Sequence, residues 1–185
     1  MQALLLVALL AAFFPGVFLR GELASAADLL YLSKPWSAHT PAAFAGPGNP
    51  IMPDMIAAML PYYAVAKEAL ARGEWPLWNP YEMAGLPLLA NCQSAVFYPP
   101  RLLHAVFDLH TATSLYYLLK LWLCGMTAFL CARGLGMSLF GARFLSILWA
   151  FNGFNYVWCY WPLPDVSAWL PVLFTARPSP RRRRA

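Results

Sequence analysis

The side chains that can do chemistry are concentrated in one stretch of this chain, between its apolar segments. They are Asp28, His39, Asp54, Glu68, Glu74, Asn79, Glu82, Asn91, Gln93 and His104. A carboxylate among them can take a proton from a hydroxyl group or hold a divalent cation. The sequence contains no Ser/His/Asp order, HExxH motif, phosphate-binding glycine loop or DxD pair. The pattern alone therefore predicts no particular reaction. A non-catalytic membrane protein, such as a transporter or an envelope-assembly scaffold, fits it nearly as well.

Residues 73–100, which we call the signature loop, read GEWPLWNPYEMAGLPLLANCQSAVFYPP. This segment interleaves prolines with tryptophan, tyrosine and phenylalanine. Proline removes a backbone donor and fixes φ, which excludes a regular spanning helix here. The segment is also too apolar and aromatic for a solvated, disordered linker. We therefore expect an ordered, extended segment that lies on an apolar surface.

The composition of the chain is that of a membrane protein. Of its 185 residues 61% are hydrophobic and 11% charged, and its mean hydropathy is +0.53. The net charge of +5 depends on four arginines at residues 181–184, so we expect no nucleic-acid partner. The four cysteines lack metal-site spacing and are interpreted as small apolar residues.

The apolar segments predict an all-α, multi-spanning membrane protein. Residues 2–19, 112–132 and 144–160 are each long enough to cross a bilayer, and residues 166–176 form a partial fourth segment. For the first segment a cleaved signal peptide is the alternative, because Ala24-Ser25-Ala26 resembles a cleavage site. An uncleaved helix is favoured, since no basic residue precedes the segment and further spans follow.

The basic residues predict the orientation in the plasma membrane. Arg133 and Arg143 flank a short loop without acidic residues, which is typical of a cytoplasmic loop. The N-terminus is then cytoplasmic and residues 20–110 are extracytoplasmic. The expected segments are a first span at 1–19, an outer loop with short helices at 20–110, further spans at 111–176 and a basic tail at 177–185.

Two short helices are expected within the outer loop. Residues 54–72 read as a helix that Asp54 caps, that Pro61 kinks or splits, and that Gly73 ends. Residues 101–109 read as a short interfacial helix leading to the next span. The basic tail has two interpretations: a truncated or frame-shifted end of a longer chain, or a genuine tail that binds lipid phosphates.

Several motifs occur in a fixed order along the chain. They are Asp54, Pro61-Tyr62, Gly73-Glu74-Trp75-Pro76-Leu77-Trp78-Asn79-Pro80-Tyr81, Gly85-Leu86-Pro87-Leu88-Leu89-Ala90-Asn91, Gln93-Ser94-Ala95-Val96-Phe97-Tyr98-Pro99-Pro100, Arg133-Gly134-Leu135-Gly136, Phe151-Asn152-Gly153-Phe154 and Ala168-Trp169-Leu170-Pro171. This order resembles the YfhO family, bacterial multi-spanning membrane proteins of the GT-C glycosyltransferase type. The resemblance covers the chain up to about Phe174, and the arginine tail departs from it. Chains of that family are several times longer, so the similarity concerns only their N-terminal part.

The resemblance implies sugar transfer on the outer face of the membrane. The donor is then a polyprenyl-phosphate sugar, and the acceptor a cell-envelope polymer or lipid. Asp54 matches the acidic residue that such enzymes keep in the first outer loop, with Asp28 as a second candidate. This carboxylate would act as a proton acceptor or would hold a divalent cation. The alternative for Asp54 is a helix cap.

Five residues are expected to bind the substrate. Lys120, inside a span, and Arg101, at the outer interface, are candidates for the donor phosphate. Lys120 has snorkelling or an interior ion pair as its alternative, and Arg101 has interfacial anchoring. Asn79, Asn91 and Gln93 are candidates for sugar hydroxyls. The aromatic residues of the signature loop either stack on sugars or, as we favour, lie in the headgroup region.

Overall fold

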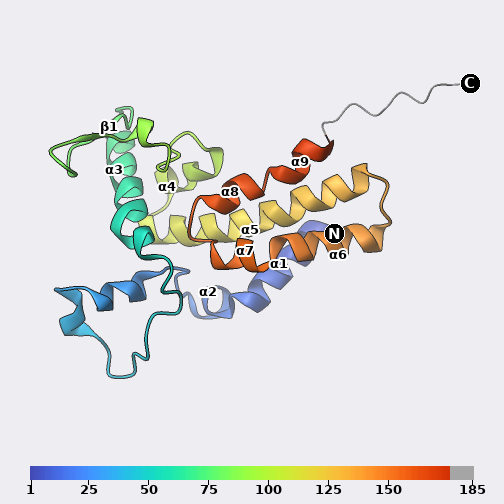
Figure 1. Cartoon of the computed structure of the whole chain (residues 1–185), viewed down its shortest axis with the longest axis horizontal. Helices are drawn as coiled ribbons and strands as arrows, with labels where there is room; N and C mark the ends of the chain where they lie inside the picture. The colour runs from blue at the N-terminus through green and yellow to red at the C-terminus, as the bar shows by residue number, and fades with distance from the viewer. Residues whose placement is uncertain (176–185) are drawn as a thin grey trace, which may run out of the picture. The chain divides into compact units, whose positions relative to one another are not determined.

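The computed structural model describes residues 1–175, and helices make up most of them. The chain forms two compact units, coloured along the sequence in Figure 1. The helical unit contains Met1–Phe13 and the chain from Lys120 onward, and the loop unit contains Phe14–Leu119. The predicted basic tail, residues 177–185, lies outside the described residues.

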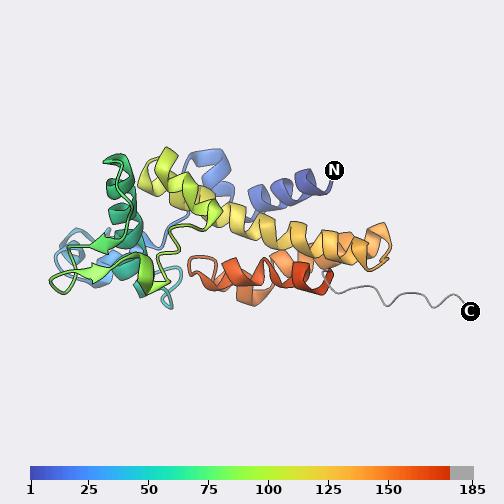
Figure 2. The same cartoon turned by 90° about the horizontal axis from the view of Figure 1, so that it is seen from above.

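The helical unit consists of short helices packed on the second half of one long helix. Its elements are α1 (Gln2–Phe13), α5 (Leu109–Gly134) from Lys120 onward, α6 (Leu139–Ala150), α7 (Gly153–Val157), α8 (Leu163–Ser167) and α9 (Leu170–Thr175). The α1 helix and the α8–α9 pair lie on different sides of α5 (Figures 1 and 2). The close approach of α1 to α5 depends on Gly125, because a Cβ there would meet the Leu6 side chain at 2.8 Å.

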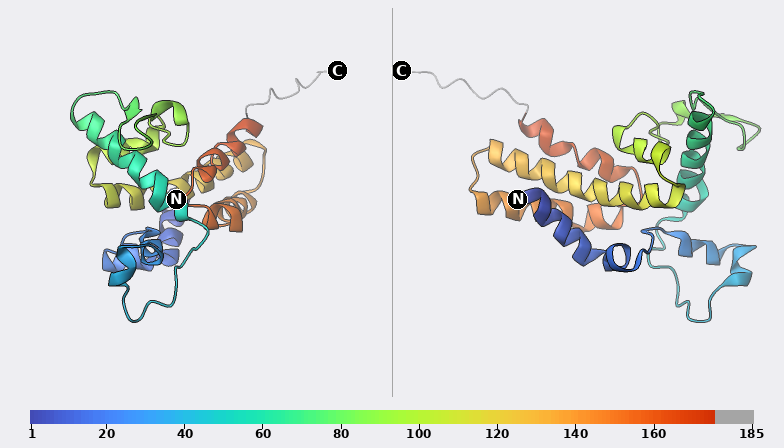
Figure 3. Two further views of the ribbon diagram at one scale, coloured as in Figure 1. Left: turned by 60° about the vertical axis from the view of Figure 1, so that its left-hand side comes forward. Right: turned by 180° about the vertical axis from the view of Figure 1, so that it is seen from behind.

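The loop unit contains the remaining elements. They are α2 (Pro15–Arg20), η1 (Ala27–Leu32), η2 (Trp36–His39), η3 (Met55–Met59), α3 (Leu60–Ala71), β1 (Trp78–Asn79), β2 (Leu86–Pro87), η4 (Leu89–Asn91), η5 (Pro99–Leu102), α4 (Leu103–Val106) and the start of α5. The strands β1 and β2 pair antiparallel, with Asn79 opposite Leu86. The signature loop folds around the end of α3 (Figures 1 and 3).

The helix α5 confirms the second predicted span as a helix. It has 26 residues and is the one described helix that is both long and apolar enough to cross a membrane. Asp108 begins it, because its Oδ1 accepts hydrogen bonds from the backbone N–H groups of His110 and Thr111. The structure therefore supplies one candidate span of full length, where the sequence predicted three.

The first predicted span, residues 2–19, is not one helix. It breaks at Phe14, whose φ of −121° and ψ of 57° are not helical, and α2 begins at Pro15. The proline ring disfavours helical geometry in the residue before it, which explains the break. The 12 residues of α1 extend about 18 Å, short of the ~30 Å thickness of the hydrocarbon core.

The third predicted span, residues 144–160, is also interrupted. The helix α6 begins earlier, at Leu139, and ends at Ala150. Asn152 is extended, with ψ of 158°, and its side chain caps α7 by accepting from the N–H of Asn155 at 2.8 Å. An asparagine cap thus replaces the continuous helix. The predicted partial fourth segment forms α8 and α9 up to Thr175.

The predicted helix at residues 54–72 is confirmed in outline. A π-helical turn, η3, precedes α3, and Pro61 lies in the first turn of α3, so the chain changes helix type at the proline. Gly73 follows the end of α3 with φ of +72°, as a glycine at a helix C-terminus does. The predicted helix at residues 101–109 is shorter and ends at Val106.

Candidate functional site

Two pockets lie side by side in the loop unit, between α3 and the signature loop. The small pocket, about 190 Å³, is lined by Tyr62, Asn79, Glu82, Leu86, Pro87, Ala90 and Asn91. The large pocket, about 440 Å³, is lined by Ala57, Pro61, Ala64, Val65, Glu68, Asn79, Tyr81 and Glu82. Asn79 and Glu82 belong to both linings, so the two pockets share a wall that contains a carboxylate.

The backbone of the signature loop is held in unusual conformations around these pockets. All four non-glycine residues with positive φ in the described chain lie in it: Met83, Ala84, Cys92 and Ala95. Gly85 follows with φ of +113°, and a Cβ there would meet the Trp78 indole at 2.6 Å. Such backbone strain persists only where the surroundings enforce it, and it concentrates at ligand sites. The β1–β2 turn therefore has the character of a functional loop.

Hydrogen bonds fix the shared wall. Asn79 is 3% exposed, and its Oδ1 accepts from the N–H of Tyr81 at 3.0 Å. Its Nδ2 donates to Oε2 of Glu82 at 3.3 Å. Burial, and then the negative charge of Glu82 and a hydrogen bond to it, raises the pKa of Tyr62. The Tyr62 phenol therefore keeps its proton and acts as a donor toward Glu82.

The structure brings together two of the three predicted sugar-binding amides. Asn79 and Asn91 both line the small pocket. Asn91 is half-buried, and its Oδ1 accepts from the N–H of Ser94 at 2.9 Å, which leaves Nδ2 to face a ligand. Gln93 is exposed and lines none of the three pockets described here.

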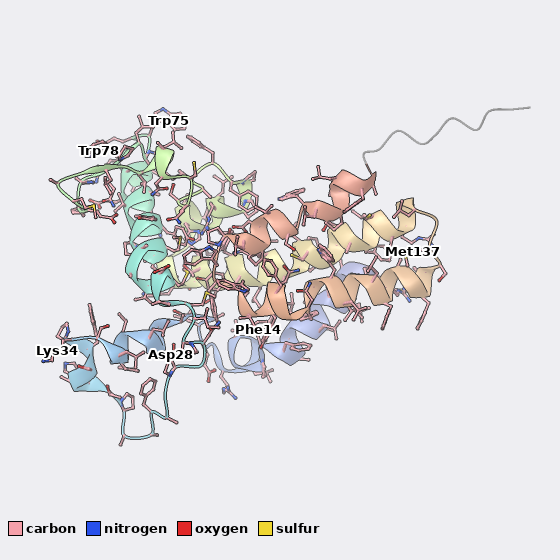
Figure 4. The ribbon with its side chains drawn as sticks, in the orientation of Figure 1. Phe14, Asp28, Lys34, Trp75, Trp78 and Met137 are labelled. Atoms are coloured by element: carbon pink, nitrogen blue, oxygen red, sulfur yellow. The ribbon has the colours of Figure 1, made fainter. Side chains whose placement is uncertain are left out.

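The predicted catalytic carboxylates lie away from the shared wall. Asp54 is exposed and stands just before η3, but its side chain makes no capping hydrogen bond. It lines neither pocket, although Ala57, three residues further along, lines the large one. Asp28 accepts from the N–H of Gly48 at 2.7 Å and lies well apart from the signature loop (Figure 4).

Arg101 lies in a cluster of aromatic rings. Its guanidinium carbon lies 3.8 Å from the ring centre of Tyr63 and 4.0 Å from that of Tyr116. Beside it, His104 is 5% exposed, and burial together with the charges of Arg101 and Lys67 lowers its pKa to about 4. These basic side chains line a third pocket of only about 20 Å³, so Arg101 serves here to join α3 to α5.

Lys120 lies in the helical unit and forms the interior ion pair that was its alternative interpretation. Its Nζ is 3.5 Å from Oδ1 of Asp165, and both side chains are buried. The same ammonium group donates to the carbonyl oxygens of Cys159 at 3.1 Å and Trp161 at 2.7 Å. Its charge and its hydrogen bonds are therefore used within the protein.

The large aromatic residues of the signature loop point outward. Trp75 is 69% exposed, Trp78 55% and Tyr81 70%, and Figure 4 labels the two tryptophans at the outer side of the loop. Of these three residues, Tyr81 lines the large pocket, and its hydroxyl donates to the Glu68 carboxylate at 3.3 Å. This exposure suits the headgroup interpretation better than stacking on a ligand inside the small pocket.

The described residues contain no group of three or more His, Cys, Asp and Glu side chains that could hold a metal ion. Of the carboxylates near the large pocket, Glu68 is already paired with Arg72 at 2.8 Å.

Tyr62 and Glu82 were not selected from the sequence as site residues, although both line the small pocket. Glu82 was included only in the general set of side chains that can do chemistry, and Tyr62 only as part of a motif. A signal was present, because Asn79 and Glu82 are three residues apart across a Pro-Tyr pair, which suits a turn that brings their side chains together. The contribution of Tyr62 depends on how the loop packs on α3, which no spacing predicts.

In comparisons with family models, with curated proteins and with solved structures, nothing matched this chain.

Proposed function

We propose that this chain is the N-terminal part of a multi-spanning membrane glycosyltransferase. It moves a sugar from a polyprenyl-phosphate donor to a cell-envelope acceptor on the outer face of the plasma membrane. The observation that carries this proposal is the wall that Asn79 and Glu82 contribute to both pockets. A transferase brings two substrates together at one reacting group, and adjoining pockets with a common carboxylate suit that task. The motif order that resembles the YfhO family supports the same function.

The proposed membrane arrangement has three spans. One is α5, and the other two are the broken helices α1–α2 and α6–α7. Their surfaces support this, because large apolar side chains of α1 and α6 are exposed: Leu4, Leu5, Val7, Phe13, Leu139, Phe140, Phe144 and Leu148. Exposed apolar surface of this extent is costly in water and suits contact with lipid. Non-helical backbone at membrane depth is tolerated where protein covers it.

The proposed orientation follows from the basic residues at the adjacent ends of α5 and α6. Arg133 and Arg143 are placed on the cytoplasmic side, so the loop unit lies outside, apart from its entry into the spans. The pockets then open on the side of the membrane where envelope acceptors are available.

The reaction needs a carboxylate at the reacting atoms. The carboxylate takes the proton of an acceptor hydroxyl while that oxygen forms a bond to the anomeric carbon. The bond from the anomeric carbon to the polyprenyl phosphate breaks, and the phosphate leaves with the electron pair. The resemblance favours Asp54 as this group, with Asp28 second. The geometry favours Glu82, because it lines both pockets.

Sugar transfer by the full-length protein tests this proposal. Transfer from a radiolabelled polyprenyl-phosphate sugar is measured for Glu82→Gln, Asp54→Asn and Asp28→Asn. Loss of the general base reduces turnover by about 10²–10⁴-fold. We expect this loss in Glu82→Gln, with unchanged thermal unfolding. If all three variants transfer sugar at the wild-type rate, catalysis by this part of the chain is excluded.

A non-catalytic transporter is the second candidate function, and one observation favours it. The Lys120–Asp165 pair is buried in the helical unit, and ionisable side chains inside membrane helices often mark a transport path. The same assay separates the two functions, because a transporter transfers no sugar to an acceptor.

A further inference from the structure

The small pocket has room for one sugar ring. Its volume of about 190 Å³ lies below the ~300–1,000 Å³ of sites that hold drug-sized ligands. The β1–β2 ribbon and Tyr62 of α3 border the pocket, which is partly open to solvent, and Met83 and Ala84 in the turn of the ribbon have positive φ. This space therefore suits one ring, and the rest of an oligosaccharide would extend beyond it.

The polar groups of the small pocket suit the hydroxyls of a sugar. The Glu82 carboxylate accepts hydrogen bonds, whereas Nδ2 of Asn91 donates them. The pocket lining therefore contains both an acceptor and a donor for sugar hydroxyls. The rest of the lining is apolar, from Leu86, Pro87 and Ala90. Such surfaces suit the C–H faces of a pyranose ring, which otherwise remain in contact with water.

The charge in this pocket is entirely negative. Glu82 is the one ionisable acid or base among the lining residues apart from the Tyr62 phenol, which keeps its proton. No lysine, arginine or histidine belongs to the lining. A ligand carboxylate in this pocket would lie close to the half-buried Glu82 carboxylate, and like charges at such a distance repel each other.

We propose that the small pocket binds the ring of an uncharged hexose and that Glu82 is the specificity-determining residue that excludes uronic acids. This assignment rests on the proposed function, since it identifies the small pocket as the sugar site of the transferase. It adds a substrate class, a selecting residue and a mechanism of selection, which is repulsion between two carboxylates.

Binding of matched sugars to the chain in lipid nanodiscs tests this inference. Saturation-transfer NMR measures the affinities of the methyl glycosides of glucose, galactose and mannose, and of the corresponding methyl uronides. We expect at least one neutral sugar to bind, and its uronide to bind about tenfold or more weakly. The Glu82→Gln variant should bring the two affinities to within about threefold of each other.

Two further variants keep the test independent of folding. Glu74→Gln removes another carboxylate of the signature loop, one that pairs with Arg72 and lines none of the three pockets, so it should preserve the discrimination. Asn91→Leu removes the donor amide. It should weaken binding of the neutral sugar without changing the preference for the neutral sugar over its uronide. If Glu82→Gln does not fold, the Asn91 and Glu74 variants still test the site.

The inference is overturned if none of the three neutral sugars binds, if a uronide binds as well as its neutral partner, or if Glu74→Gln alters the ratio as much as Glu82→Gln. Selective sugar binding without any transfer activity supports the pocket assignment and rejects the proposed function. Transfer activity without sugar binding supports the function and rejects the pocket.

Discussion

The two units differ in the solvent exposure of their ion pairs. In the helical unit, Lys120 and Asp165 are paired with side-chain exposures of 1% and 11%. In the loop unit, Arg72 and Glu68 are paired with exposures of 51% and 50%. The same kind of contact is therefore buried in one unit and solvated in the other. This difference indicates that the two units are built for different surroundings.

The apolar surfaces extend that comparison. The helical unit keeps Gln2 and Ser146 inside, joined by a hydrogen bond of 2.9 Å, while Phe140 and Phe144 of α6 are exposed. Polar groups inside and apolar groups outside are the arrangement that a lipid environment favours. The loop unit instead exposes the paired side chains of Arg72, Glu68 and Glu74, although it buries Arg101, and it forms the pockets. The comparison agrees with the proposal that one unit anchors the protein and the other recognises the substrate.

Removing one partner of the buried ion pair should give the largest effect on stability. Lys120→Met leaves Asp165 buried beside carbonyl oxygens, and we expect a loss of about 3–5 kcal/mol in the free energy of unfolding. The double variant Lys120→Met/Asp165→Leu should recover most of this loss, because no charge remains buried. Unfolding by SDS in detergent micelles measures both values. If Lys120→Met lowers the free energy of unfolding no more than the loss of an exposed ion pair does, the Lys120–Asp165 pair is not buried as described.

The loop unit should lose stability in mildly acidic solution because of His104. Its pKa is lowered from 6.5 to about 4 in the folded protein. Between these values the unfolded chain binds a proton that the folded chain does not, so stability falls as the pH drops from about 6.5 to about 4. The unfolding temperature across this range measures the effect. His104→Gln should flatten this part of the profile, and an unchanged slope would show that another group is responsible.

The start of α5 should show a smaller effect. Asp108→Ala removes the acceptor for two backbone N–H groups, and we expect a loss of stability smaller than that of Lys120→Met. The pKa of Asp108 is lowered, chiefly by its hydrogen bonds to Thr111, so the wild-type advantage should disappear below the ordinary range of a carboxyl group. Comparing the two proteins by thermal unfolding at neutral and at acidic pH measures it. Equal stability at neutral pH would rule out the cap.

The exposed ion pair should give the smallest effect. Glu68→Gln at its pair with Arg72 should cost about 0.2–1 kcal/mol, and the cost should shrink in high salt. Measured beside Lys120→Met, this variant compares one type of contact in the two units. Equal costs for both variants would mean that the units do not differ in their surroundings.

Local sequence signals predicted much of the helical structure. The long apolar run of α5, the proline at the start of α3 and the glycine after it each led to the observed element. The failures also have local causes, since Pro15 and Asn152 end helices that hydropathy alone would continue. Hydropathy averaged over a window of residues detects the length of an apolar segment, but it does not detect a single residue that interrupts the helix.

The candidate site was predictable only in part. Asn79 and Asn91 were selected because amides in an ordered outer loop suit sugar hydroxyls, and both line the small pocket. Tyr62 and Glu82 join them through packing between α3 and the signature loop. The Asp165 partner of Lys120 is likewise distant in sequence. Contacts of this kind are tertiary, and no periodicity of one sequence encodes them.

The central claim, that the loop unit faces the outside while the helical unit is embedded, can be tested with the native cysteines. Cys92 is exposed in the signature loop, whereas Cys124, Cys131 and Cys159 are buried in the helical unit. A membrane-impermeant maleimide added to intact cells from which any outer wall or membrane has been removed should label the protein at Cys92 alone. The Cys92→Ser variant should then remain unlabelled. Labelling of Cys92 only after the membrane is permeabilised would contradict the account.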